Sequence, residues 1–198
     1  MTKQTTLQKR ALVTKQSIIE AGLLILSEEG AVNFTTNKIA ERAGVSIGSL
    51  YQYFSNKESM LNLILLKRYE EDMKFLYNEI TIMEALTGSE FLNKLADLIW
   101  HRLLSSREAC KTLFIAPQNL KDQLELIESR KVITTMIAEK LKVFYPDVEN
   151  QSLSLKSTLI TESFLGIMQT ITYSDELYEM NHVMLIDYKK MIQALFSK

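Results

Sequence analysis

Apolar residues recur along this chain at the three- and four-residue spacing that is typical of amphipathic helices. In the first such segment, about residues 14–29, Ile18, Gly22 and Ile25 fall on one face. Gly30 follows at a place where a left-handed residue would end the helix. Similar segments follow at about residues 36–43, 46–53, 57–80, 89–103, 107–117, 121–144, 153–172 and 177–196. No period-two alternation bounded by turn residues interrupts them, so the pattern predicts an all-α chain of about nine helices.

The composition agrees with a helical protein that has a substantial core. Apolar residues make up 46% of the 198 residues, and charged residues make up 24%. Only two prolines, Pro117 and Pro146, and six glycines interrupt the sequence. Ser55 is expected to cap the fourth helix, because Glu58 follows three residues later as in a capping box.

Residues 35–58 have the layout of a helix-turn-helix, which is a short helix, a tight turn and a second short helix. Thr35 or Thr36 is placed to cap the first helix, and Ser46 is placed to cap the second. Gly44 between them permits the positive φ that the turn needs. The alternative is an ordinary pair of core helices, in which the Tyr-Gln-Tyr-Phe run at 51–54 is simply buried.

The second short helix carries side chains suited to DNA. Gln52 offers a bidentate pair to adenine, and Ile47 offers an apolar contact to a thymine methyl group. Gly48 lets the backbone approach the groove wall, and the short Ser49 side chain donates or accepts. The remaining polar groups suit phosphate oxygens: Thr36, Tyr51, Tyr53 and Lys57.

The charge is divided unevenly along the chain. The formal net charge of the whole chain is −1. Residues 1–57 hold seven basic and four acidic side chains, a net of +3, and residues 58–198 hold 16 basic and 20 acidic ones, a net of −4. Such a division is expected when one end of the chain meets phosphate.

Residues 14–66 resemble the N-terminal domain of the TetR family of bacterial transcriptional regulators. The matching residues are Ile19–Ala21, Gly30, Thr35, Thr36, Ile39, Ala40, Ala43, Gly44, Val45, Gly48, Ser49, Leu50, Tyr51, Tyr53, Phe54, Lys57, Glu58 and Leu61. The resemblance implies a homodimeric repressor of about nine helices that binds a pseudo-palindromic operator in double-stranded DNA. It implies DNA contacts from Thr36, Ser46, Ile47, Gly48, Ser49, Tyr51, Gln52, Tyr53 and Lys57. Ile47 departs from the polar residue that is common at its position in the family.

Two apolar stripes near the C-terminus are candidates for a pairing surface. In the arrangement that the resemblance implies, they would form a four-helix bundle with their symmetry mates. The predicted dimerisation residues are Ile160, Ile167, Ile171, Met184, Tyr188, Met191 and Leu195. The alternative is that both stripes are ordinary core of one chain.

The resemblance also implies that a small molecule binds the C-terminal part. Aromatic and methionine side chains suit an adaptable apolar pocket. The candidate ligand-binding residues are Tyr69, Met73, Tyr77, Trp100, His101, Phe114, Met136, Glu162, Phe164 and Met168. His101 and Glu162 are the members that could orient a polar group of the ligand, and each residue has the alternative of being plain core.

Other functional classes lack a motif in this sequence. His101 and Cys110 are too far apart in sequence to share one helix face, so neither a Cys-His nucleophile nor a zinc site is indicated. No phosphate-binding glycine loop occurs, and no cofactor is expected. The single cysteine, the lack of a secretory signal and the lack of an apolar run of membrane-spanning length predict a cytoplasmic protein without membrane contact.

We therefore expect a DNA-binding domain at residues 1–57 and a ligand-binding and dimerisation domain at residues 58–198. The expected function is transcriptional repression that a small, largely apolar effector relieves, and no enzymatic activity is expected. Two alternatives stay open at this point. One is a constitutive dimeric DNA-binding protein without an effector, and the other is an all-α interaction module whose helix pair does not bind DNA.

Overall fold

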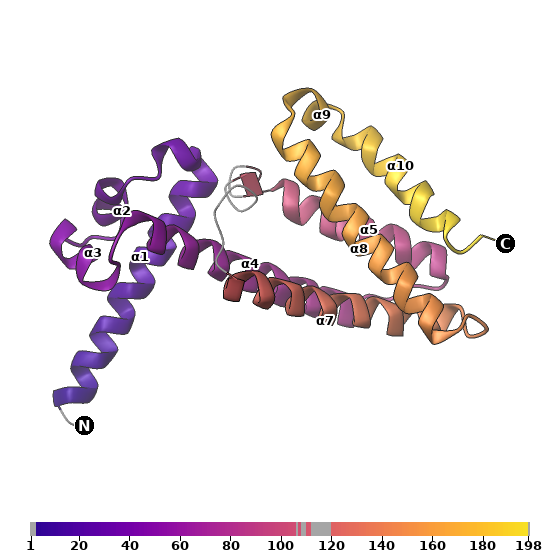
Figure 1. Cartoon of the computed structure of the whole chain (residues 1–198), viewed down its shortest axis with the longest axis horizontal. Coiled ribbons are helices and arrows are strands. Elements are labelled where there is room, and N and C mark those ends of the chain that lie inside the picture. Colours follow the sequence, from indigo (N-terminus) through magenta and orange to yellow (C-terminus); the bar gives the residue numbers. More distant parts are fainter. Residues whose placement is uncertain (1–2, 106, 108–109, 112–119, 198) are drawn as a thin grey trace. The chain divides into compact units, whose positions relative to one another are not determined.

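The computed structural model describes residues 3–105, 107, 110–111 and 120–197, and the described chain is helical almost throughout (Figure 1). The helices in this part are α1 (Lys3–Asn33), α2 (Thr36–Arg42), α3 (Ile47–Tyr53), α4 (Lys57–Ile82), α5 (Gly88–Leu104), α7 (Leu120–Phe144), α8 (Asn150–Tyr173), α9 (Asp175–Glu179) and α10 (Asn181–Ala194). No strand occurs among these residues, and the all-α prediction is confirmed. The short helix predicted at 107–117 lies largely outside the described residues.

Three features of the helices differ most from the sequence prediction. Helix α1 begins at Lys3, about three turns earlier than predicted, because no glycine or proline precedes Gly22. Asn56 caps α4 in place of Ser55, since its Oδ1 accepts a hydrogen bond from the Ser59 backbone N–H at 2.7 Å. The single helix predicted over 177–196 is two helices, α9 and α10, which meet at Met180.

The chain separates into two compact units, and the boundary between them falls within α4, after residue 69. The first unit contains α1, α2, α3 and the beginning of α4. Its core is a set of fully buried side chains that includes Ile18, Ile39, Leu50, Met60 and Ile64. All four helices therefore contribute to one small core, which holds the helix pair in place.

The second unit begins at residue 70 and packs α5, α7, α8 and α10 around an aromatic centre. The Trp100 ring lies 6.0 Å from that of Phe164 and 6.2 Å from that of Tyr188, centroid to centroid. The Tyr188 hydroxyl donates to the Ile160 carbonyl at 2.7 Å, and burial raises the pKa of Tyr188 well above its usual range. The hydroxyl therefore stays neutral and ties α10 to α8.

An ion pair joins α4 to α5 within the second unit. The Arg102 Nε donates to the nearly buried Asp72 Oδ1 at 2.7 Å, and the guanidinium lies 4.6 Å from the centroid of the Phe75 ring. None of the helices in the described part is both long enough and apolar enough to span a membrane.

Candidate nucleic-acid interface

The turn between α2 and α3 forms as the sequence predicts. Thr35 caps α2, with its side chain accepting from the Lys38 N–H at 3.3 Å. Gly44 has a φ of 67°, in the left-handed region that a side chain would strain. The Val45 N–H then donates to the Ala40 carbonyl at 2.9 Å, which closes the turn. The local chemistry of these residues therefore fixes the angle at which α3 leaves α2.

Helix α3 has one buried face and one open face. Ser46 caps it, because its Oγ accepts from the Ser49 N–H at 3.1 Å. Leu50 is fully buried, and Phe54 at the C-cap is 4% exposed. On the open face Ile47 is 40% and Tyr51 is 48% exposed. The other open or half-buried positions of the helix and its cap are Ser46, Gly48, Ser49, Gln52 and Tyr53.

Two of the residues predicted to contact phosphate lie side by side. The Tyr51 hydroxyl donates to Thr36 Oγ1 at 3.4 Å, so the outer side of α3 reaches the first turn of α2. Lys57, also exposed, holds its ammonium 5.8 Å from the centroid of the Phe34 ring. The three side chains are accessible to a phosphate, and their DNA contacts stay predictions.

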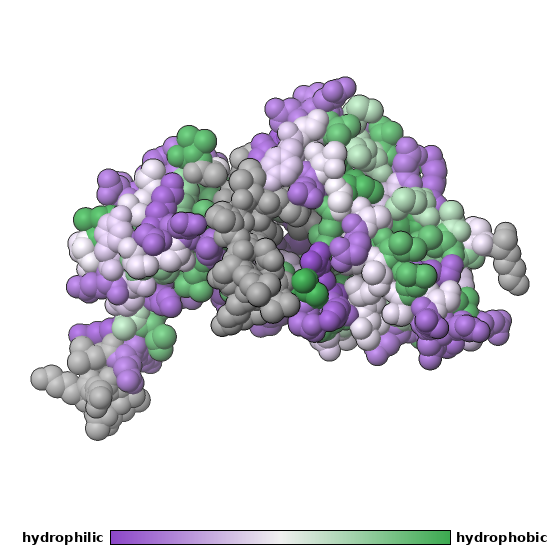
Figure 2. Space-filling model, viewed as in Figure 1, coloured by the Kyte–Doolittle hydropathy of each residue, from purple (hydrophilic) through white to green (hydrophobic). Residues whose placement is uncertain are grey.

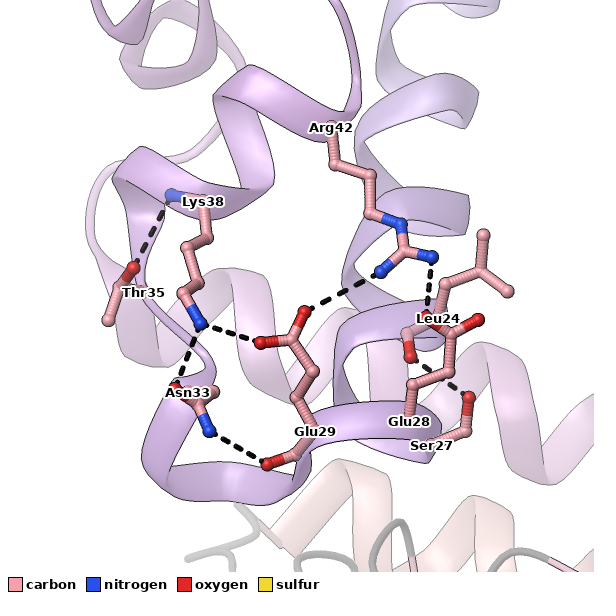
Figure 3. Close-up of polar contacts among 8 residues, drawn as sticks. All are labelled: Leu24, Ser27, Glu28, Glu29, Asn33, Thr35, Lys38 and Arg42. Atoms are coloured by element: carbon pink, nitrogen blue, oxygen red, sulfur yellow. Dashed lines mark hydrogen bonds and ion pairs between the residues drawn. The ribbon is translucent and has the colours of Figure 1, made fainter.

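A cluster of ion pairs joins the end of α1 to α2 (Figure 3). Lys38 Nζ lies 2.6 Å from Glu29 Oε2, and Arg42 reaches Glu28 at 2.5 Å and Glu29 at 3.6 Å. Lys38 Nζ also donates to Asn33 Oδ1 at 2.9 Å. These contacts hold α2 against α1. They also pair both cations of α2 with carboxylates of α1.

The predicted ligand-binding residues are scattered between core and surface. Trp100, Phe164 and Met168 lie in the core of the second unit, and Met73 and Met136 pack against that core. Tyr69 is half-buried and belongs to the first unit, and Phe114 lies outside the described residues.

Three of the predicted ligand-binding residues lie at the surface of the chain. Tyr77, His101 and Glu162 are exposed, so they do not line the enclosed core of the second unit. Glu162 instead accepts from Arg130 Nη1 on the surface at 3.3 Å. The sequence favoured Tyr77 for its aromatic ring and His101 and Glu162 for their polar groups, and their ligand role stays a prediction.

Most of the predicted dimerisation residues are covered by their own chain, and their role in pairing stays a prediction. Ile160, Ile171 and Tyr188 are at most 2% exposed, buried by their own chain. Ile167, Met184 and Leu195 are half-buried against the same core, and only Met191 is clearly exposed. The predicted stripe is therefore mostly the inner face of α8 and α10, because helical spacing marks burial without showing what covers the residue.

The outer faces of the same two helices carry the apolar residues that the sequence analysis missed. On α8 these are Leu155 and Leu159, exposed by 62% and 48%, and on α10 they are Val183 and Ile186, exposed by 39% and 52%. Hydrophobic side chains gather on the displayed face over α8 and α10 (Figure 2). A second helical stripe offset from the first was the available signal for this surface.

Comparison with known proteins identifies the first unit. Residues 18–64 match the family model for bacterial regulatory proteins of the tetR family. The first unit is a TetR-family domain. The match covers α2, α3 and the parts of α1 and α4 that form the buried core of the first unit.

A curated bacterial regulator is similar to part of this chain. The fatty acid metabolism regulator protein of Bacillus subtilis is 38% identical over 64 residues, which are 29% of this chain and 33% of that protein. The match thus spans about a third of the relative's length.

Two solved structures extend the likeness to the whole TetR fold. FadR of Bacillus subtilis, in complex with stearoyl-CoA, superposes with a TM-score of 0.59 at 17% identity, over 92% of this chain and 97% of that one. A TetR-family regulator of Mesorhizobium loti gives a TM-score of 0.67 at 17% identity, over 94% and 96%. At these identities the likeness shows that the second unit has the same fold as these proteins.

Proposed function

We propose that this TetR-family chain is a dimeric transcriptional regulator that binds operator DNA through α3 and is released by a small apolar effector. The observation that carries the proposal is the open face of α3, where Gly48, Tyr51 and Gln52 are exposed while Leu50 anchors the helix from behind. A recognition helix needs one buried face and one exposed face, because only exposed side chains can contact the bases in the DNA groove. No catalytic role is proposed.

A dimer is proposed because one helix pair reads only a few base pairs. Two copies related by a twofold axis read two half-sites about one helical turn apart. The surface we assign to the partner chain is the outer face of α8 and α10, with Leu155, Leu159, Val183 and Ile186. Exposed apolar side chains on two neighbouring helices are suited to an interface.

The effector is proposed to bind in the second unit, near Trp100. Trp100 is 1% exposed, and its Nε1–H donates to no acceptor within the described part of the chain. The Ser157 hydroxyl, fully buried on α8, likewise makes no hydrogen bond there. Buried polar groups are normally paired, so two unpaired ones in an apolar core suit a ligand with an apolar body and a polar group.

Because Trp100 is the single tryptophan, its fluorescence reports on this core. We expect stearoyl-CoA to change the Trp100 emission in a saturable way and to release the protein from its operator. The choice of probe follows from FadR of Bacillus subtilis, whose structure contains it. Coenzyme A alone is the control and should do neither. Unchanged emission with intact operator binding at saturating stearoyl-CoA would contradict an acyl-CoA effector.

The α3 assignment is tested by substitution on a duplex that the protein recognises. Replacing Gln52 by alanine should lower discrimination at one base position by about 1–3 kcal/mol, because a bidentate base contact is lost. Tyr51→Ala should weaken binding to all sequences alike, because its partner is phosphate. Both effects are measured by titrating matched and base-substituted duplexes.

The matched control is Gln16→Ala, which removes an exposed glutamine from α1 of the same unit. It should leave affinity and base preference unchanged. A Gln52→Ala protein with the affinity and the base preference of the parent would contradict a recognition role for this face of α3.

A further inference from the structure

The first turns of α1 form a positively charged segment that precedes the family match. Helix α1 begins at Lys3, whereas the match to the family model begins at residue 18 of this chain. This stretch contains Lys3, Lys9, Arg10 and Lys15, and the first acidic residue of the chain is Glu20. The segment thus carries four positive charges and no negative one, and the family match does not include it.

These cations differ from those of α2, which carboxylates of α1 neutralise (Figure 3). Lys9 and Arg10 are exposed, and no carboxylate stands within one helical turn of either in the sequence. Positive charge on an exposed helix without intrahelical partners is available to an external anion. A polyanion gains most from such a segment, because it meets several charges at once.

The basic segment starts beside the recognition helix. Lys15 Nζ lies 6.0 Å from the centroid of the Phe54 ring, and Phe54 is the C-cap of α3. From there α1 continues toward its N-terminus, beyond α2 and α3 (Figure 1). A helix rises about 1.5 Å per residue, which puts the backbone of Arg10 about 7.5 Å and that of Lys9 about 9 Å beyond that of Lys15.

DNA held by α3 would present sugar-phosphate strands on both sides of the occupied groove. Each strand offers a phosphate about every 3.4 Å along the axis, within the reach of long basic side chains that extend from the same unit. Exposed Leu12 and Val13 share the segment, which makes an anionic lipid surface the competing partner. Continuity with α3 favours DNA.

We propose that the first turns of α1, through Lys9 and Arg10, make a second, sequence-independent contact with the phosphates of DNA bound by α3. The proposal rests on the proposed function, because it requires α3 to hold the duplex. The contact made by Lys9 and Arg10 adds affinity and salt dependence to DNA binding, while α3 determines the base preference.

The test is the salt dependence of duplex binding by the full chain and by a Lys9→Gln/Arg10→Gln variant. Glutamine keeps the helix propensity of lysine and arginine, so α1 should persist. Each lost phosphate contact lowers the slope of log K against log salt by about 0.9. For the double variant, the slope of log K against log salt should be smaller by about 2 per protomer than for the parent protein. Its affinity for the duplex at low salt should be about 10-fold or more weaker. The loss should be equal on the recognised and a scrambled duplex.

The charge-matched control is Lys131→Gln/Lys190→Gln, which removes two exposed lysines from the second unit and should leave the slope unchanged. If the parent binds duplex DNA and the Lys9/Arg10 variant shows the same slope, the inference is overturned while the proposed function stands. If the parent binds no duplex, the proposed function fails first. A variant that keeps its slope but no longer co-sediments with phosphatidylglycerol vesicles would overturn the inference in favour of a lipid contact.

Discussion

Replacing Leu159 and Ile186 together by glutamate is expected to convert the proposed dimer into monomers and to weaken operator binding about 100-fold or more. Both side chains are about half exposed in one chain, on the outer faces of α8 and α10. A charge forced into an apolar interface without a partner costs several kcal/mol. A monomer then loses the simultaneous use of two half-sites, which is worth roughly 10²–10⁴ in affinity.

Sedimentation velocity measures the oligomeric state, and duplex titration measures the affinity. The control is Val143→Glu on α7, which places the same charge at a position that is 75% exposed and outside the proposed interface. It should stay dimeric and bind normally. A Leu159→Glu/Ile186→Glu protein that sediments with the parent would show that the partner chain covers another surface.

Trp100→Ala is expected to lower the free energy of unfolding of the second unit by about 3–5 kcal/mol. Trp100 is 1% exposed and lies between Phe164 on α8 and Tyr188 on α10, so truncation leaves a cavity that three helices line. Trp100→Phe keeps most of the ring and removes the unpaired Nε1–H. It should therefore cost less than the alanine variant.

Urea unfolding followed by circular dichroism gives these free energies, since the variants have no tryptophan to follow. Tyr77→Ala is the control, because this aromatic residue of α4 is 48% exposed. It should change stability by less than about 1 kcal/mol. An alanine variant at Trp100 as stable as the Tyr77 control would contradict the central place of the indole in the core.

The helix pair could be predicted from the sequence because its signals are local. Thr35, Ser46 and Gly44 each act on backbone groups within a few residues of themselves, and the structure confirms all three roles. The break between α9 and α10 could not be predicted in the same way. It occurs at Met180, without glycine or proline, and so has no local marker.

The pairing surface shows what helical spacing leaves undecided. Ile160 and Leu159 are neighbours on α8, yet one is fully buried and the other is about half exposed. Both belong to apolar stripes with the same period, and the sequence does not say which stripe faces the chain's own core. The rotation of α8 about its axis is set by its packing against α7 and α10, and the sequence of α8 alone does not contain that information.

The basic start of α1 was missed for the opposite reason. Residues before about 14 lack a clear stripe of apolar residues at helical spacing, so the sequence pattern predicted no helix there. The structure continues α1 through them to Lys3, as an extension of a helix whose later turns are anchored by Ile18 and Ile25. Helix propagation from an anchored segment is favourable even where no side chain is buried.

The most direct test of the central claim is selection of bound sequences from a pool of random DNA duplexes by the purified full chain. The account predicts enrichment of one pseudo-palindromic sequence, with half-sites about one helical turn or a multiple of it apart. The same selection with the Gln52→Ala protein should recover a sequence relaxed at symmetry-related positions. A pool without enrichment, or an enriched sequence without twofold symmetry, would contradict a dimer that reads DNA through α3.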